Sequence, residues 1–67
     1  MSTQRMATVI RKLRERRNLT QEDLAKRAKV ARSYVARLER GHSTNPSLAV
    51  VRRLAKALKV KVGELLE

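Results

Sequence analysis

The fold is decided by residues 19–41, which read LTQEDLAKRAKVARSYVARLERG. Apolar residues recur here at helical spacing in two short runs, and the runs are joined too tightly for their helices to lie antiparallel. A helix-turn-helix needs a small residue where its helices cross, and apolar residues on both sides of the turn and along the second helix. The residues that fill these positions are Ala25, Ala28, Val30, Val35 and Leu38. The segment is therefore predicted to be a helix-turn-helix.

Length and composition limit what such a domain can do. With 67 residues, the chain has room for one small domain and for no separate catalytic or ligand-sensing unit. There is no Cys, His42 is the only His, and the two glycines are isolated, so we expect no metal, no cofactor and no enzyme. No apolar run reaches the roughly 20 residues that a membrane span needs. We expect a cytoplasmic, nucleoid-associated protein.

The charge of the chain favours a polyanionic partner. Seventeen Lys and Arg residues against six Asp and Glu residues give a net charge of +11. Tyr34 is the only aromatic residue, whereas membrane-surface helices and proteins that recognise single strands or RNA loops normally use more aromatic side chains. Duplex DNA is therefore the favoured partner. A protein-interaction module and a non-specific nucleoid or RNA binder remain as alternatives.

The periodicity of the whole chain predicts an all-α domain of five helices without strands. Asn18 is expected to end the first helix in a left-handed conformation, Thr20 and Asp23 to form a capping box, and Ser47 to cap the fourth helix. Residues 1–4 are expected to be a flexible N-terminus, and residues 5–67 the folded domain. The expected helices span about residues 5–17, 20–28, 32–40, 48–58 and 62–66.

Several short segments carry a resemblance to a known family. They are IRKLR at 10–14, LTQEDLA at 19–25, RSYV at 32–35, LERG at 38–41, NPSL at 45–48 and LAKAL at 54–58. In this order and spacing the chain resembles the phage-repressor and Cro type of helix-turn-helix, the XRE family, over about residues 9–66. The resemblance implies a lambda-repressor-like fold in which the second and third helices form the helix-turn-helix. It also implies that the third helix enters the major groove of DNA by its N-terminal end.

The resemblance implies base contacts from the third helix. Arg32, Ser33 and Arg37 are the candidates for base edges, and the chemistry is suitable because an Arg can donate two hydrogen bonds to guanine O6 and N7. Tyr34 is expected to contact a base or the DNA backbone, or else to cover the edge of its helix.

Phosphate contacts are implied at the start of the second helix and in the loop after the third. The candidates are Thr20, Gln21, Arg40, His42, Ser43, Thr44 and Asn45. Gln21 can also support the first reading residue, Arg32, and His42 can equally be an ordinary exposed loop residue. Arg14 and Glu39 are expected to form a structural ion pair.

The chain departs from the family pattern at two corners between helices. Lys29 and Lys59 stand where Gly is usual, and Ala31 and Lys61 stand where Ser or Thr usually caps the next helix. A positive φ at Lys29 would cost about 1 kcal/mol, and a missing cap about as much. We therefore expect either a reshaped turn or compensation elsewhere in the domain.

Taken together, these features predict a sequence-specific transcriptional regulator that binds double-stranded DNA as a homodimer on a palindromic operator. The side chains expected at the dimer interface are Val60, Val62, Leu65 and Leu66, which alternatively only close the monomer core. A restriction-modification controller, a phage-type repressor and a DNA-binding antitoxin all fit this prediction. A toxin or polymerase partner stays open.

Overall fold

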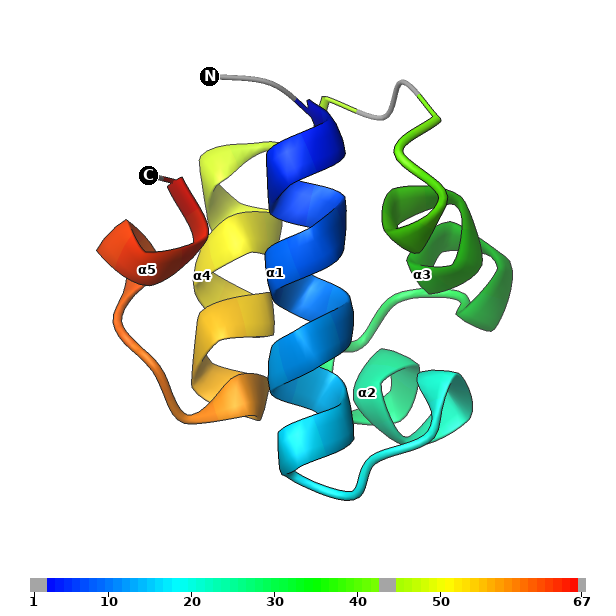
Figure 1. Ribbon diagram of the computed structural model, residues 1–67. Coiled ribbons are helices and arrows are strands. Elements are labelled where there is room, and N and C mark those ends of the chain that lie inside the picture. The colour runs from blue at the N-terminus through cyan, green and yellow to red at the C-terminus, as the bar shows by residue number, and fades with distance from the viewer. Residues whose placement is uncertain (1–2, 43–44, 67) are drawn as a thin grey trace.

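Five helices make up most of the computed structural model, which describes residues 3–42 and 45–66 (Figure 1). They are α1 (Thr3–Arg16), α2 (Gln21–Ala28), α3 (Arg32–Glu39), α4 (Leu48–Leu58) and α5 (Val62–Leu66). The prediction of an all-α fold with five helices is confirmed for these residues. Four bounds differ from the prediction by one or two residues: α1 begins at Thr3 instead of residue 5 and ends at Arg16 instead of residue 17, α2 begins at Gln21 instead of residue 20, and α3 ends at Glu39 instead of residue 40.

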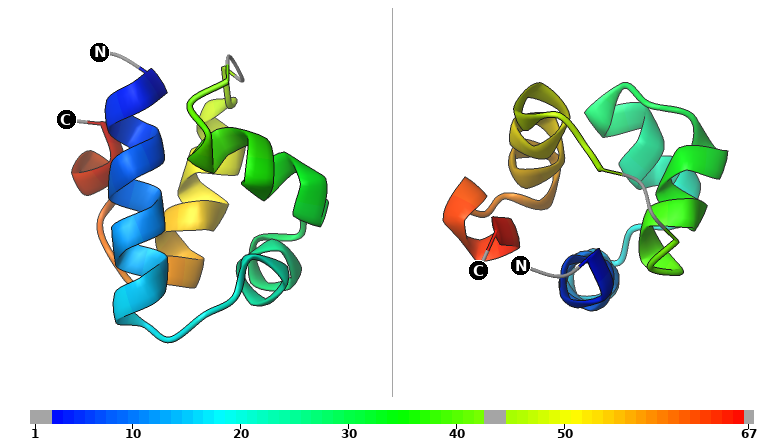
Figure 2. Two further views of the ribbon diagram at one scale, coloured as in Figure 1. Left: turned by 45° about the vertical axis from the view of Figure 1, so that its right-hand side comes forward. Right: turned by 90° about the horizontal axis from the view of Figure 1, so that it is seen from above.

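The helices form a ring around the core (Figure 2). α1 packs against α5, α5 against α4, α4 against α2, α2 against α3, and α3 against α1. In the view of Figure 1, α1 lies in front, α5 lies on one side, and α2 and α3 lie on the other. The helix-turn-helix therefore occupies the side of the ring opposite α5.

Each helix contributes at least one fully buried side chain to the core. Ile10, Leu24, Leu38, Leu54 and Leu65, one from each helix in turn, expose no more than 1% of their surface. Ala25 and Ala28 are also buried, as the helix-turn-helix pattern predicted, and their small size lets α2 approach its neighbours closely. The helix-turn-helix is thus held by the same core that α1, α4 and α5 complete.

A complete capping box begins α2. The Thr20 hydroxyl accepts a hydrogen bond from the Asp23 backbone N–H at 3.0 Å, and the Asp23 carboxylate accepts one from the Thr20 backbone N–H at 3.0 Å. The bonds from Thr20 lower the pKa of the Asp23 carboxyl, because they stabilise its charged form. The predicted cap is confirmed, and it fixes the residue at which α2 begins.

Three corners between helices adopt the left-handed conformation, at Asn18 (φ 56°), Lys29 (φ 59°) and Lys59 (φ 59°). All three close the helix before them with the same pair of backbone hydrogen bonds. After α2, for example, the Lys29 N–H donates to the Lys26 carbonyl and the Val30 N–H to the Ala25 carbonyl. These two hydrogen bonds satisfy carbonyl groups that a helix end leaves unpaired. Lys29 and Lys59 therefore keep the geometry usually made by Gly, at a conformational cost of about 1 kcal/mol each.

Two arginines stabilise the Lys29 and Lys59 corners, one from α4 and one from the turn that follows α1. Arg53 of α4 donates from Nε to the carbonyl oxygen of Ala28 at 2.9 Å. Arg17 donates from Nε to the carbonyl oxygen of Leu58 at 3.1 Å and from Nη2 to that of Lys59. A guanidinium at the negative end of a helix is favourable, so these bonds offset part of the strain at the corners. The turn is compensated and not reshaped.

The helices after the Lys29 and Lys59 corners, α3 and α5, begin without the usual cap side chain. Ala31 precedes α3 in an extended conformation and offers no side-chain acceptor. At Lys61, which precedes α5, the backbone N–H donates instead to the Glu64 carboxylate at 3.1 Å. Despite the missing cap, α3 begins at Arg32, where the sequence predicted it.

Candidate nucleic-acid interface

A partly buried ion pair connects the end of α3 to α1. Arg14 donates from Nε to Glu39 Oε2 at 2.6 Å and from Nη2 to Glu39 Oε1 at 3.1 Å. Its Nη1 donates to the carbonyl oxygen of Leu19 at 2.7 Å. The side chains of Arg14 and Glu39 expose only 13% and 4% of their surface, and the hydrogen bonds that Arg14 donates to Glu39 raise the pKa of Arg14. The structure therefore contains the expected ion pair.

Gln21 extends this network to the start of α2. Its Nε2 donates to Glu39 Oε1 at 3.0 Å, so one carboxylate receives donors from both α1 and α2. The amide keeps a second N–H and its Oε1 acceptor, so support of Arg32 by Gln21 stays a prediction. This arrangement orients α3 relative to α1 and α2 through a single side chain of α3.

The outer face of α3 is basic because its one acidic residue points inward. Arg32, Ser33 and Arg37 are all exposed, whereas Glu39 exposes only 8% of its surface and belongs to the network just described. Arg40, the residue after α3, is exposed too. The face thus presents three guanidinium groups and a hydroxyl to solvent, a set of donors suited to phosphates and base edges.

Tyr34 lies at the edge of this face. Its side chain is half-buried and packs against the core, next to the exposed residues of α3. Of the two roles considered for it, covering the helix edge is the one that this packing provides.

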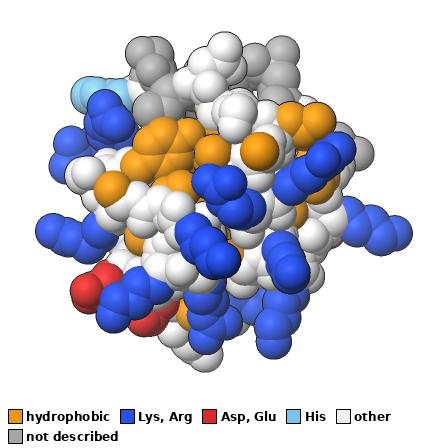
Figure 3. Space-filling model, turned by 180° about the vertical axis from the view of Figure 1, so that it is seen from behind, with side chains coloured by type: hydrophobic (Ala, Val, Ile, Leu, Met, Phe, Trp, Pro, Cys, Tyr) orange, Lys and Arg blue, Asp and Glu red, His pale blue; other side chains and the backbone are white. Residues whose placement is uncertain are grey.

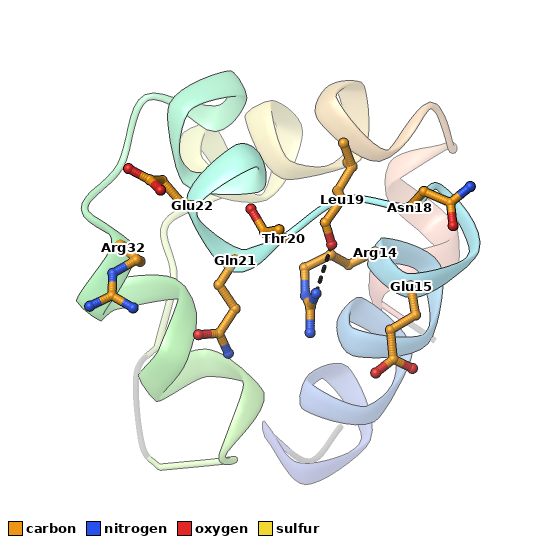
Figure 4. A pocket seen from close by; sticks show the side chains of 8 residues that line it. All are labelled: Arg14, Glu15, Asn18, Leu19, Thr20, Gln21, Glu22 and Arg32. Atoms are coloured by element: carbon orange, nitrogen blue, oxygen red, sulfur yellow. Dashed lines mark hydrogen bonds between the residues drawn. The ribbon is translucent and has the colours of Figure 1, made fainter.

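A shallow depression of about 670 Å³ brings together three predicted contact residues, Thr20, Gln21 and Arg32 (Figure 4). The depression lies where the end of α1, the start of α2 and the start of α3 meet. It is also lined by Arg14, Glu15, Asn18, Leu19 and Glu22. Thr20 is exposed, but its hydroxyl oxygen already accepts the capping bond from Asp23. Arg37 and Arg40 lie outside this depression, farther along α3.

The loop between α3 and α4 is described only in part. Gly41 adopts a positive φ of 75° directly after Arg40, which turns the chain away from the helix. His42 and Asn45 are exposed. The predicted contacts Ser43 and Thr44 lie outside the described residues.

The four residues expected at a dimer interface do not share one environment. Leu65 exposes 1% of its surface and belongs to the monomer core, so it has no surface to offer a partner. Val60 and Val62 are half-buried against that core, and Leu66 is 39% exposed. The prediction of Leu65 at a dimer interface is therefore wrong. Adjacent residues of a helix point in different directions, so Leu65 faces α1 and α4 while Leu66 faces solvent.

Comparisons with known proteins define the class of the chain. Residues 10–65 match the helix-turn-helix family. The chain belongs to this XRE-type family of DNA-binding transcriptional regulators, and the prediction of a regulator and not an enzyme is confirmed. The match covers all five helices except the first turns of α1 and the last residue of α5.

Two solved structures are similar over nearly the whole chain. The restriction-modification controller protein C.AhdI from Aeromonas hydrophila is 38% identical with a TM-score of 0.89, and 94% of each chain is covered. This similarity confirms the lambda-repressor-like fold. The controller protein C.Esp1396I, solved as a tetramer in complex with its natural 35 base-pair operator, is 27% identical with a TM-score of 0.80, covering 97% of this chain and 95% of that one.

Curated relatives are regulators of greater length. The transcriptional regulator SlrR of Bacillus subtilis is 34% identical over 59 residues, which are 88% of this chain and 39% of SlrR. The immunity repressor of Bacillus phage phi105 is 41% identical over 56 residues, which are 84% of this chain and 38% of the repressor. The chain therefore spans about two fifths of the length of these two relatives.

The length of the helices and the grouping of metal-binding side chains bear on alternative functions. None of the helices in residues 3–42 and 45–66 is long and apolar enough to cross a membrane. In the same part of the chain, no three His, Cys, Asp or Glu residues are grouped so as to hold a metal ion.

Proposed function

We propose that this protein is a sequence-specific regulator that binds double-stranded DNA as a homodimer on a palindromic operator in the cytoplasm. The observation that carries the proposal is the outer face of α3, where Arg32, Ser33 and Arg37 are exposed and Glu39 is withdrawn into the Arg14 network. The operator complex of the similar controller protein C.Esp1396I supports it.

Base recognition is assigned to α3. Its N-terminal end enters the major groove first in this class of proteins, which places Arg32 and Ser33 nearest the base edges. A bidentate contact from an Arg to guanine contributes about 1–3 kcal/mol of discrimination against other bases. Arg37 follows Ser33 by one helical turn and lies on the same side of α3.

Phosphate binding is assigned to the residues that flank α3. We place them on the two strands that border the groove, where they set the register of α3 without reading sequence. The residues are Thr20 and Gln21 at the start of α2, and Arg40, His42, Ser43, Thr44 and Asn45 after α3. Arg40 supplies the fixed positive charge of this set.

Dimerisation is assigned to the hydrophobic side chains at the C-terminal end that the monomer leaves accessible. Leu66 is the main one, and Val60 and Val62 border it. Two copies paired by a two-fold axis would present their α3 helices to successive major grooves about 34 Å apart. This spacing requires a palindromic operator.

Selection of binding sites from a pool of random duplexes tests the proposal. Recovery of a palindrome supports a dimeric, sequence-specific regulator. Uniform retention of all sequences would instead identify a non-specific nucleoid binder, and no retention of duplex DNA would identify a protein-interaction module. Either of these two results contradicts the proposal.

A further inference from the structure

A second basic surface lies at the other end of α2. Five cationic side chains from α2, α4 and the corners that follow them line a depression of about 390 Å³. They are Arg27, Lys29, Arg53, Lys56 and Lys59, and the only other lining residue is Ala57. We call this depression the α2–α4 cleft. Both helices lie behind α1 in Figure 1 and face the reader in Figure 3, where Lys and Arg side chains spread over the surface.

The positive charge of the α2–α4 cleft is balanced only in small part within the described part of the chain, where the Asp23 carboxylate interacts electrostatically with Arg27 from outside the cleft. No carboxylate lines the cleft. The ion pairs Arg14–Glu39 and Lys26–Glu22 lie outside the cleft, and neither includes one of its five cations. Five like charges around one concave surface repel one another, and an anion bound between them removes that repulsion.

Two of the five cations occupy backbone positions that disfavour them. Lys29 and Lys59 both adopt the left-handed conformation. The third corner with this geometry and the same backbone hydrogen bonds is occupied by Asn18, a residue better suited to it, and Asn18 does not line the cleft. Strained lysines are thus found at the two corners that face the cleft. Strain retained at a surface position points to a function of the side chain.

Arg53 is oriented at the cleft by a hydrogen bond to the backbone. Its Nε donates to the carbonyl oxygen of Ala28 at 2.9 Å, which fixes the plane of the guanidinium at the cleft. The two Nη groups of a guanidinium held in this way form a rigid fork that matches two oxygens of one phosphate. The lysines around it contribute point charges that follow the remaining oxygens.

We propose that the α2–α4 cleft binds a compact anion carrying several phosphates, as in inorganic triphosphate or the triphosphate of a nucleotide. None of its lining residues is aromatic or carries a side-chain acceptor, so recognition comes from the phosphates and not from a base. None is assigned to DNA binding above. The cleft lies about one length of α2 from Gln21, roughly 12 Å for eight residues, so it is separate from the α3 outer face.

The replacement of Lys29 and Lys59 by Gly gives a sharp test, because it removes two cleft charges and relieves backbone strain at the same time. Binding of inorganic triphosphate and of ATP is measured by titration calorimetry at physiological ionic strength, with amide chemical shifts to locate the site. The K29G/K59G variant is expected to bind about tenfold more weakly while unfolding at a higher temperature. Because this variant is expected to be more stable than the wild type, unfolding cannot explain a loss of triphosphate binding.

The control variant, K12Q/K61Q, removes the same number of charges outside the cleft. It is expected to keep its affinity for triphosphate within about threefold. Equal affinity of the wild type for triphosphate and ATP supports a site for phosphates alone, and tighter binding of ATP supports a nucleotide as the source. Both results agree with the proposal.

Three results would overturn it. The first is equal weakening of triphosphate binding in K29G/K59G and K12Q/K61Q, which indicates general charge attraction. The second is a set of shifts centred on α3 and not on residues 27–29 and 53–59, or no binding at all. The third is a loss of duplex DNA affinity in K29G/K59G as large as the loss of triphosphate affinity, because the cleft would then be a DNA backbone contact.

Discussion

Glu39 receives hydrogen bonds from Arg14 at 2.6 Å and from Gln21 at 3.0 Å, so the last residue of α3 is held by two helices at once. Removing one partner of a buried ion pair leaves the other charge without compensation. We expect Arg14→Met to lower the free energy of unfolding by about 3 kcal/mol, measured by urea denaturation. The double variant R14M/E39L should recover most of that loss, and failure to recover would show that the Arg14 bond to Leu19 dominates.

Asp23 makes stability depend on acidity. Its pKa lies below the ordinary value of 3.8 because Thr20 donates to its carboxylate. A carboxyl group with a lowered folded-state pKa stabilises the fold above the unfolded-state pKa, and this contribution disappears as the pH falls through the folded-state pKa. We therefore expect Asp23→Asn to be less stable than wild type at pH 7 and equally stable at about pH 2. A gap in melting temperature that persists unchanged in acid would contradict this.

Lys29→Gly should stabilise the protein by about 1 kcal/mol, because Gly adopts the left-handed conformation without a Cβ penalty. Lys12→Gly makes the same replacement inside α1 and should destabilise by about 1 kcal/mol. Thermal unfolding of the two variants decides the matter. If both lose stability, the corner at Lys29 is not strained.

Arg32 and Arg40 should differ in the way they lose DNA binding. We expect Arg32→Ala to lower the ratio of specific to non-specific affinity, because the lost contact is to a base. Arg40→Ala should weaken binding to all duplexes alike and reduce the salt dependence by about one charge. Fluorescence anisotropy with operator and scrambled duplexes over a salt series separates the two. Arg32 is not a reading residue if its variant loses both affinities equally.

Leu65 and Leu66 provide an adjacent pair for testing the dimer surface. Leu66→Glu should weaken self-association with little change in the unfolding of the monomer, because this side chain is 39% exposed. Leu65→Ala should instead lower the free energy of unfolding by about 2–5 kcal/mol, because it leaves a cavity in the core. Sedimentation equilibrium reports the first effect and denaturation the second. Unchanged association in Leu66→Glu would move the dimer interface to another surface.

The apolar period predicted most of the fold because burial is periodic along a helix. Ala28, Val35 and Leu38 are buried where the pattern required it, and α4 and α5 have the predicted bounds. The same period explains why Leu65 is buried and Leu66 is exposed. Grouping Val60, Val62, Leu65 and Leu66 as one apolar set did not reveal this difference. The DNA contacts stay predictions, since they depend on a partner.

The bonds of Arg17 and Arg53 were not predictable from sequence. Arg17 reaches a helix end 41 positions away along the chain, and Arg53 reaches one 25 positions away. Such a contact depends on how helices pack, and a local pattern carries no information about it. The internal use of the Gln21 donor escaped prediction for the same reason.

The corners at Asn18, Lys29 and Lys59 are closed by the same two backbone hydrogen bonds, which use no atom of the corner residue's own side chain. The direction of each following helix is therefore independent of the side chain that stands at the corner. Replacing Lys29 or Lys59 by Gly lowers the surface charge and raises the stability, while every helix keeps its place. Affinity for anions can then evolve in this domain without any change of architecture.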